Sequence, residues 1–115
     1  MRARLLRDAL HDSRRIADDY AGTSTPVLGD EFFEAVEAAL AELGRHPEIG
    51  RELQWHKKQE PLVGLRGWAL SPPFRAFRLF YRITPESVDV VRVLHGAEDI
   101  ERALSAPSGK PERFG

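Results

Sequence analysis

The chain has 115 residues, of which 42% are hydrophobic and 30% are charged, with a formal net charge of −1 and no cysteine. This length supports one hydrophobic core rather than two, and the apolar content excludes a largely disordered chain. The lack of cysteine excludes disulfides and thiolate metal sites, and no apolar run reaches the roughly 20 residues of a membrane-spanning helix. No signal peptide is recognised at the start, so a soluble cytoplasmic protein is expected.

The charge is unevenly distributed along the chain. Residues 1–60 carry nine Lys or Arg against twelve Asp or Glu, whereas residues 61–95 carry five Arg against Glu86 and Asp89. A positive middle segment in an acidic chain indicates a local basic surface. Its natural ligand would be a polyanion or an acidic segment of a partner.

A short strand and an amphipathic helix are predicted at the start of the chain. Residues 2–5 alternate between arginine and apolar side chains, as in a short edge strand. From Leu6 to Tyr20, apolar and small residues repeat every three or four positions and so share one helical face. Gly22 is expected to end this helix.

A second helix is predicted after a short connection. Thr25 is a good N-cap, and Pro26 is a good first helical residue. An apolar stripe runs from Phe32 to Leu43, and Gly44 follows it. Because the connection is short, the two helices should pack as an antiparallel pair with their stripes facing inward.

The second half of the chain has the period of β-strands. Residues 52–60 show no sustained period and are predicted as a loop, in which residues 55–58 (WHKK) could touch a nucleic acid or simply be exposed. The runs 62–70, 75–83 and 87–95 are rich in β-branched and aromatic residues and are separated by short turns. They predict an antiparallel meander, with the last run in the centre because it is apolar on both faces.

Alternation along these strands separates an apolar face from a basic face. The apolar residues of the middle run should pack against the helices: Phe77, Leu79, Tyr81 and Ile83. Four arginines could line up on the other face as candidate binding residues: Arg66, Arg78, Arg82 and Arg92. They could bind phosphate or carboxylate groups, or they could be solvated side chains on an open sheet face. Arg92 lies on an otherwise apolar strand, so it should have a carboxylate or carbonyl neighbour.

The last strand ends in His95 and Gly96, and two interpretations of this pair are open. Histidine titrates near neutral pH and suits acid or base catalysis, which makes His95 the catalytic candidate. Alternatively, the pair is a structural corner, with the ring hydrogen-bonded to the backbone and Gly96 in a conformation that other residues resist. The structural interpretation is favoured because no catalytic partner is evident. The four histidines lack metal-ligand spacing, so neither a metal nor another cofactor is predicted.

Several motifs carry a resemblance to a known superfamily. The motifs DDYAG, PEIGR, LRGWAL, FRLFYRI and VDVVRVLHGAEDIERAL, in this order, resemble the RelE/ParE superfamily of toxins from toxin–antitoxin pairs over about residues 2–104. The resemblance is closer to the ParE branch, whose members typically continue the last strand as Leu-His-Gly-Ala-Arg-Asp. This chain has Glu98 in place of that arginine, which removes a positive charge at the rim of the expected site.

The resemblance implies an α+β fold of β-α-α-β-β-β order. In this fold an antiparallel sheet packs on the N-terminal helical pair, and a short C-terminal helix follows. A single domain is expected over residues 1–105. Residues 106–115 are rich in Pro, Gly and Ser and are predicted to form a disordered tail.

The resemblance also implies a growth-inhibiting toxin of the plasmid-stabilisation type. A cognate, ParD-like antitoxin would hold it inactive, and a toxin dimer within the toxin–antitoxin complex is compatible with the resemblance. ParE toxins act on DNA gyrase, whereas RelE toxins cut mRNA on the ribosome. These two targets define the main alternatives for function.

Catalytic chemistry helps to separate these alternatives. RNA cleavage needs a general base, a general acid and cations that hold the phosphate charge. RelE-type enzymes use arginine and lysine with a tyrosine or histidine near the C-terminus, but Tyr20 and Tyr81 are both predicted inside this domain. A non-enzymatic gyrase inhibitor is therefore favoured over a ribosome-dependent mRNA endoribonuclease. An inactive toxin fold that only binds an antitoxin is a third interpretation.

Overall fold

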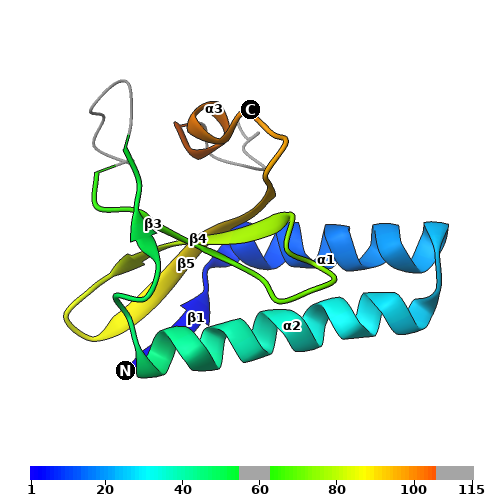
Figure 1. Ribbon diagram of the computed structural model, residues 1–115, viewed down its shortest axis with the longest axis horizontal. Coiled ribbons are helices and arrows are strands. Elements are labelled where there is room, and N and C mark those ends of the chain that lie inside the picture. Colours follow the sequence, from blue (N-terminus) through cyan, green and yellow to red (C-terminus); the bar gives the residue numbers. More distant parts are fainter. Residues whose placement is uncertain (55–62, 106–115) are drawn as a thin grey trace.

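The computed structural model describes residues 1–54 and 63–105, so the 55–58 cluster and the 106–115 tail lie outside the described residues. Within these ranges the elements are β1 (Arg2–Leu5), α1 (Arg7–Thr23), α2 (Pro26–Arg45), β2 (Arg51–Glu52), β3 (Arg66–Ala69), β4 (Phe77–Ile83), β5 (Ser87–His95) and α3 (Ile100–Ser105). The strands form one sheet of order β1-β5-β4-β3-β2, with α1 and α2 on one face and α3 on the other (Figure 1).

The two predicted helices are confirmed as an antiparallel pair. Thr25 caps α2 as expected, because its side-chain oxygen accepts a hydrogen bond from the Leu28 N–H at 3.1 Å. The helices approach each other closely at Gly29, where an added Cβ would lie 2.8 Å from the Ala17 carbonyl oxygen. The apolar stripes of both helices are buried against each other and against the sheet: Ala9, Ile16 and Ala17 in α1, and Phe32, Val36 and Leu43 in α2.

All three predicted strands of the second half are confirmed. β5 has the predicted bounds, whereas β3 and β4 are shorter than the runs that predicted them. β5 has a neighbouring strand on each side and is therefore an interior strand of the sheet. However, β4 rather than β5 lies in the middle of the strand order.

Two features of the sheet differ from the prediction. β1 pairs in parallel with β5, with Ala3 opposite Val88, so the sheet is mixed rather than antiparallel. In addition, β2 pairs with β3 although its residues showed no strand pattern. Neither pairing has a local signature in the sequence, because the first joins distant parts of the chain and the second involves a strand of only two residues.

The sheet buries apolar side chains on both faces. On the helical face, Leu79 and Tyr81 are buried in the core, and the rings of Phe32 and Phe74 meet edge to face at 5.3 Å. On the opposite face, a second group of apolar side chains is no more than 2% exposed: Leu65, Phe80 and Leu94. The face opposite the helical pair is therefore not a wholly solvated polar surface.

Tyr81 holds the connection between α2 and β2 in place. Its hydroxyl donates to the Pro47 carbonyl at 2.7 Å and accepts from the Gly50 N–H at 2.9 Å. Burial raises the pKa of Tyr81, so the hydroxyl stays protonated and able to donate. A Cβ at Gly50 would lie only 2.6 Å from this hydroxyl, so the contact requires glycine. A buried side chain of β4 thus positions β2.

Replacing Tyr81 with phenylalanine should lower the free energy of unfolding by about 1–3 kcal/mol, because a buried backbone N–H and a partly buried carbonyl lose their partner. Urea denaturation measures the change. Tyr20→Phe is the matched control, because the Tyr20 ring packs on Phe74 and Phe77 and its hydroxyl has no hydrogen-bond partner in the described part of the chain. Equal losses in the two variants would contradict the role assigned to the Tyr81 hydroxyl.

Candidate functional site

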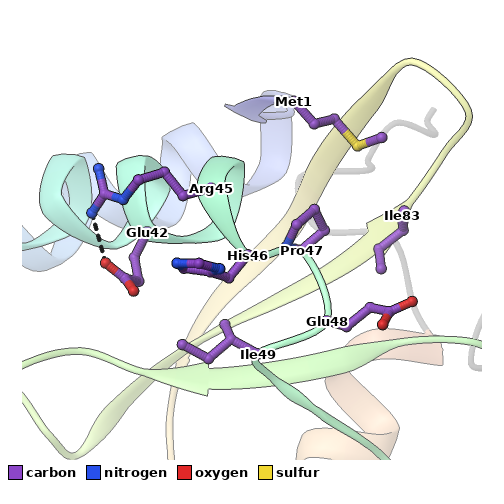
Figure 2. A pocket seen from close by; sticks show the side chains of 8 residues that line it. All are labelled: Met1, Glu42, Arg45, His46, Pro47, Glu48, Ile49 and Ile83. Atoms are coloured by element: carbon purple, nitrogen blue, oxygen red, sulfur yellow. Dashed lines mark hydrogen bonds and ion pairs between the residues drawn. The ribbon is translucent and has the colours of Figure 1, made fainter.

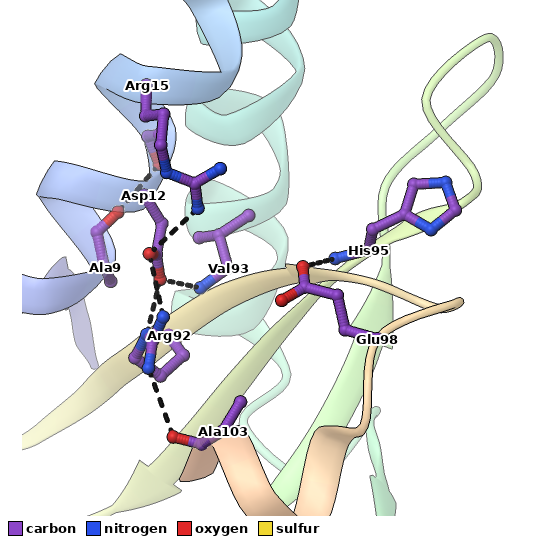
Figure 3. A network of polar contacts seen from close by, with 9 residues as sticks. Ala9, Asp12, Arg15, Arg92, Val93, His95, Glu98 and Ala103 are labelled. Atoms are coloured by element: carbon purple, nitrogen blue, oxygen red, sulfur yellow. Dashed lines mark hydrogen bonds and ion pairs between the residues drawn. The ribbon is translucent and has the colours of Figure 1, made fainter. Parts of the chain in front are cut away.

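The chain leaves β5 through a compact turn that His95 and Glu98 hold together (Figure 3). The backbone N–H of His95 donates to Glu98 Oε2 at 2.9 Å, and the backbone N–H of Glu98 donates to the His95 carbonyl at 3.0 Å. The backbone N–H of Ala97 donates to His95 Nδ1 at 2.9 Å. Glu98, at the position where the ParE-type motif has arginine, therefore closes the turn.

The hydrogen bond to the backbone limits what the His95 ring can do. Because Nδ1 accepts a hydrogen bond, the neutral ring carries its proton on Nε2. Nε2 in this form is a donor and cannot remove a proton from a substrate. The ring also packs edge-on against Phe77, with 5.1 Å between the centroids. The hydrogen bond expected of a structural corner is thus present.

Gly96 does not have the backbone conformation that was predicted. In the described ranges only Gly64 has a positive φ, of 81°. The Gly96 N–H donates to the Ala76 carbonyl at 2.7 Å, and an added Cβ would lie 3.4 Å from that oxygen. A small residue is favoured here by the close approach of another segment rather than by a left-handed backbone.

Arg92 and Asp12 form a buried ion pair between β5 and α1 (Figure 3). Arg92 Nε donates to Asp12 Oδ2 at 2.6 Å, and Nη2 donates to Asp12 Oδ1 at 3.0 Å. The side chains of Arg92 and Asp12 are 13% and 3% exposed. Arg92 Nη1 also donates to the Ala103 carbonyl of α3 at 3.2 Å. Arg92 therefore has both the carboxylate and the carbonyl neighbour that its position required.

The ion pair is an anchor for three elements rather than a binding surface. Asp12 Oδ2 also accepts from the backbone N–H of Val93 at 3.0 Å. Burial by itself would lower the pKa of Arg92, but the hydrogen bond and charge of Asp12 raise it, so the guanidinium stays charged. Asp12 was not among the candidate residues predicted from the sequence. Its signal was its position three residues after Ala9 and four before Ile16, inside an apolar stripe where a lone carboxylate would be costly.

Arg66 does not lie on the face predicted for it. It pairs with Tyr81 across the sheet, so its side chain belongs to the helical face. Its Nη1 donates to the Gly50 carbonyl at 2.8 Å and to the Glu48 carbonyl at 3.3 Å. The predicted alignment of Arg66 with Arg78 is wrong, because register was not readable from alternation alone.

Among the arginines on the sheet face opposite α1 and α2, three are termed the outer basic face: Arg51, Arg78 and Arg82. Arg51 pairs with Gly67, which itself pairs with Phe80, and Arg78 pairs with Leu94. Arg51 and Arg78 are exposed, whereas Arg82 is partly buried and donates to the Val63 carbonyl at 3.3 Å. Arg51 was missed because its strand was not predicted.

An open hollow of about 760 Å³ lies where α2 ends (Figure 2). It is lined by Met1, Glu42, Arg45, His46, Pro47, Glu48, Ile49 and Ile83. Much of its surface is apolar, and Glu42 accepts from Arg45 at 2.7 Å on its rim. Among residues 1–54 and 63–105, no three His, Asp or Glu side chains are grouped so that they could hold a metal ion. No helix in these ranges is long and apolar enough to cross a membrane.

Replacing Arg92 with methionine should lower the free energy of unfolding by about 3–5 kcal/mol, because Asp12 would be left buried and unpaired. Chemical denaturation measures the loss. The control is Arg4→Met, which removes the ion pair with Asp89 at 2.8 Å from a side chain that is 55% exposed. This control should change stability little, because water screens exposed pairs. If the two variants lose equal stability, the buried pair is not the anchor inferred above.

Comparison with known proteins agrees with the fold. The family model for the "ParE toxin of type II toxin-antitoxin system, parDE" matches residues 3–100. A solved structure titled "Chromosomal ParDE TA system from P. aeruginosa" matches with a TM-score of 0.66 and 17% identity, covering 83% of this chain and 95% of that chain. No curated protein matches the chain significantly. At this identity the structural match supports the fold alone, but the family model spans most of the sequence, and the chain therefore belongs to the ParE toxin family of type II toxin–antitoxin systems, the ParE branch of the RelE/ParE superfamily.

Proposed function

We propose that this chain arrests growth by inhibiting DNA gyrase in the cytoplasm and that a cognate, ParD-like antitoxin neutralises it. The observation that carries the proposal is the match of the ParE toxin family model over residues 3–100. ParE toxins as a group resemble one another in acting on gyrase, whereas the RelE branch acts on ribosome-bound mRNA. Membership of the ParE branch therefore favours gyrase as the target.

The geometry at the end of β5 supports a non-enzymatic mode of action. Ribonuclease chemistry would need a base and an acid on opposite sides of one phosphate. The Nδ1 atom of His95 is occupied by the Ala97 N–H, and Glu98 binds the backbone of His95 rather than its ring. Tyr81 is fully buried, and Tyr20 packs within the aromatic cluster of the core. None of these groups is arranged as an acid and base pair.

The outer basic face is the proposed contact surface for the target or the antitoxin. Arg51 and Arg78 are exposed on a face whose centre is apolar, with Phe80 and Leu94. Guanidinium groups bind carboxylates and phosphates in a bidentate manner. An acidic segment of a partner, or a nucleic acid bound to the target, would match this combination of charge and shape. Oppositely charged surfaces chiefly raise the rate of association.

The purified chain should inhibit DNA supercoiling by gyrase and leave ribosome-bound mRNA intact. Both assays are run on the same preparation, together with His95→Ala and, as a matched control, the exposed His11→Ala. Cleavage of mRNA in the ribosomal A site that is lost only in His95→Ala would contradict the proposal and identify an endoribonuclease. Binding to the antitoxin without either activity would instead indicate an inactive toxin fold.

The double variant Arg51→Glu/Arg78→Glu should slow association with the antitoxin or with gyrase by about tenfold or more, because it reverses the field that steers the partner. Stopped-flow or surface-based kinetics at several salt concentrations measures the rate, and the wild-type rate should fall as salt increases. Arg7→Glu/Arg14→Glu is the control, since it makes the same charge change at exposed positions on α1. If all the proteins are folded and their rates are equal, the arginines of the outer basic face are only solvated.

A further inference from the structure

The turn after β5 is built on the neutral form of His95. The Ala97 N–H donates to His95 Nδ1 at 2.9 Å, and this contact uses the lone pair that Nδ1 has only in the neutral ring. A protonated ring carries an N–H at both of its nitrogens. Two N–H donors would then face each other at this position. The contact that holds Ala97 is therefore lost when the ring takes up a proton.

The His95 ring is accessible to protons and has room to rotate. It is partly exposed, and its nearest ring neighbour is Phe77, with 5.1 Å between the centroids. Its Nε2 has no hydrogen-bond partner among residues 1–54 and 63–105. A protonated ring can thus turn away from Ala97 without breaking a further hydrogen bond of the side chain.

Charged groups of both signs surround the turn. Glu98 contacts the backbone of His95, so a carboxylate is available within the turn itself as a new partner for a cationic ring. Arg92 on β5 is already held by Asp12. Arg78 lies on the other sheet face, because His95 pairs with Phe77. The charged residues of the turn and of the segments that adjoin it are Arg75, Arg78, Glu98, Asp99, Glu101 and Arg102.

The turn leads directly into α3 (Figure 3). Asp99 Oδ1 accepts from the Arg102 N–H at 3.2 Å in the first turn of this helix. No residue of α3 is fully buried, and Arg92 holds its far end through the Ala103 carbonyl at 3.2 Å. Polar contacts near its two ends therefore fix much of the position of α3. Opening the turn removes the contacts at one of these ends.

We infer that the turn of residues 95–98 is a protonation switch that controls the attachment of α3. At pH 8 the neutral ring of His95 accepts from Ala97, and the turn is closed. At pH 5 the cationic ring leaves Ala97, the turn opens, and α3 is attached mainly at its Arg92 end. Histidine is the side chain that changes its charge between about pH 5 and 8. The switch goes beyond the proposed function, since it would act in the same way whichever target the toxin has.

NMR spectroscopy of the full-length, ¹⁵N-labelled chain tests the switch. At pH 8 the ring signals of His95 should show the proton on Nε2 and none on Nδ1. Amide exchange with water, divided by the intrinsic rate at each pH, gives the protection of the Ala97 and Ala103 amides. Both values should fall at least threefold from pH 8 to pH 5, with the midpoint of the ring titration, because Ala97 loses Nδ1 and the Ala103 N–H donates to Asp99 beside the turn. A proton on Nδ1 at pH 8, or unchanged protection of either amide, would overturn the inference.

Three variants identify the group that titrates. In His95→Asn the side-chain oxygen can accept from the backbone N–H two residues on but does not titrate, so the protection of both amides should persist at pH 5. His46→Asn is the matched control at the exposed C-cap of α2 and should behave like the wild type. Glu98→Gln keeps an oxygen for the His95 N–H, so the pH dependence should remain.

The variants also show how the inference fails. A pH dependence that survives in His95→Asn, or that disappears in Glu98→Gln, would mean that a group other than the His95 ring is the switch. Thermal melts confirm that each variant is folded. The ring signals of the wild type decide the question even where a variant does not fold, because a closed turn requires an unprotonated Nδ1.

Discussion

The buried ion pair between Asp12 and Arg92 is the interaction on which the arrangement of the remaining elements depends. β1 pairs with β5 only as far as Val90, so β5 continues beyond its neighbour with unpaired backbone groups. Asp12 accepts the N–H of Val93 in this region and binds Arg92 at the same time. One carboxylate on α1 thus supplies the hydrogen-bond acceptor that a neighbouring strand would otherwise provide for Val93. Arg92 then extends the connection to α3 through the Ala103 carbonyl.

This anchor fixes the start of the turn that ends β5. The turn is closed by local contacts of His95 and Glu98, and these contacts use a ring nitrogen and a carboxylate that catalysis would need free. An arginine at position 98 could not accept a hydrogen bond from the His95 N–H. With Glu98 in place of arginine, the rim has one positive charge fewer, and the turn gains the hydrogen bond from the His95 N–H to Glu98.

The surfaces of the molecule differ in charge on the two faces of the sheet. The outer basic face carries exposed Arg51 and Arg78, whereas α2 carries the exposed Glu34 and the partly exposed Glu42. A partner that wraps around the domain would need segments of opposite charge in a defined order. The two surfaces would select the correct orientation of such a partner by repulsion as well as by attraction, because the reversed orientation would bring like charges together.

The sequence by itself determined the elements whose signals are local. The stripes of α1 and α2, the cap at Thr25 and the bounds of β5 follow from periodicity and turn chemistry within a few residues, and the need of Arg92 for a polar neighbour follows from its apolar strand. The candidate arginines were found by the same alternation, which assigned Arg78 and Arg82 to one face. These features depend on contacts between residues that are close in the chain.

Only the tertiary structure decided which distant residues meet. The register places Arg66 opposite Tyr81 instead of beside Arg78, brings Arg51 onto the outer basic face through β2, and sets β1 parallel to β5. Alternation specifies two faces for each strand but not which residue of the next strand lies opposite. That choice is made by backbone hydrogen bonds and packing across the whole domain, and the same long-range packing selected Asp12 as the partner of Arg92.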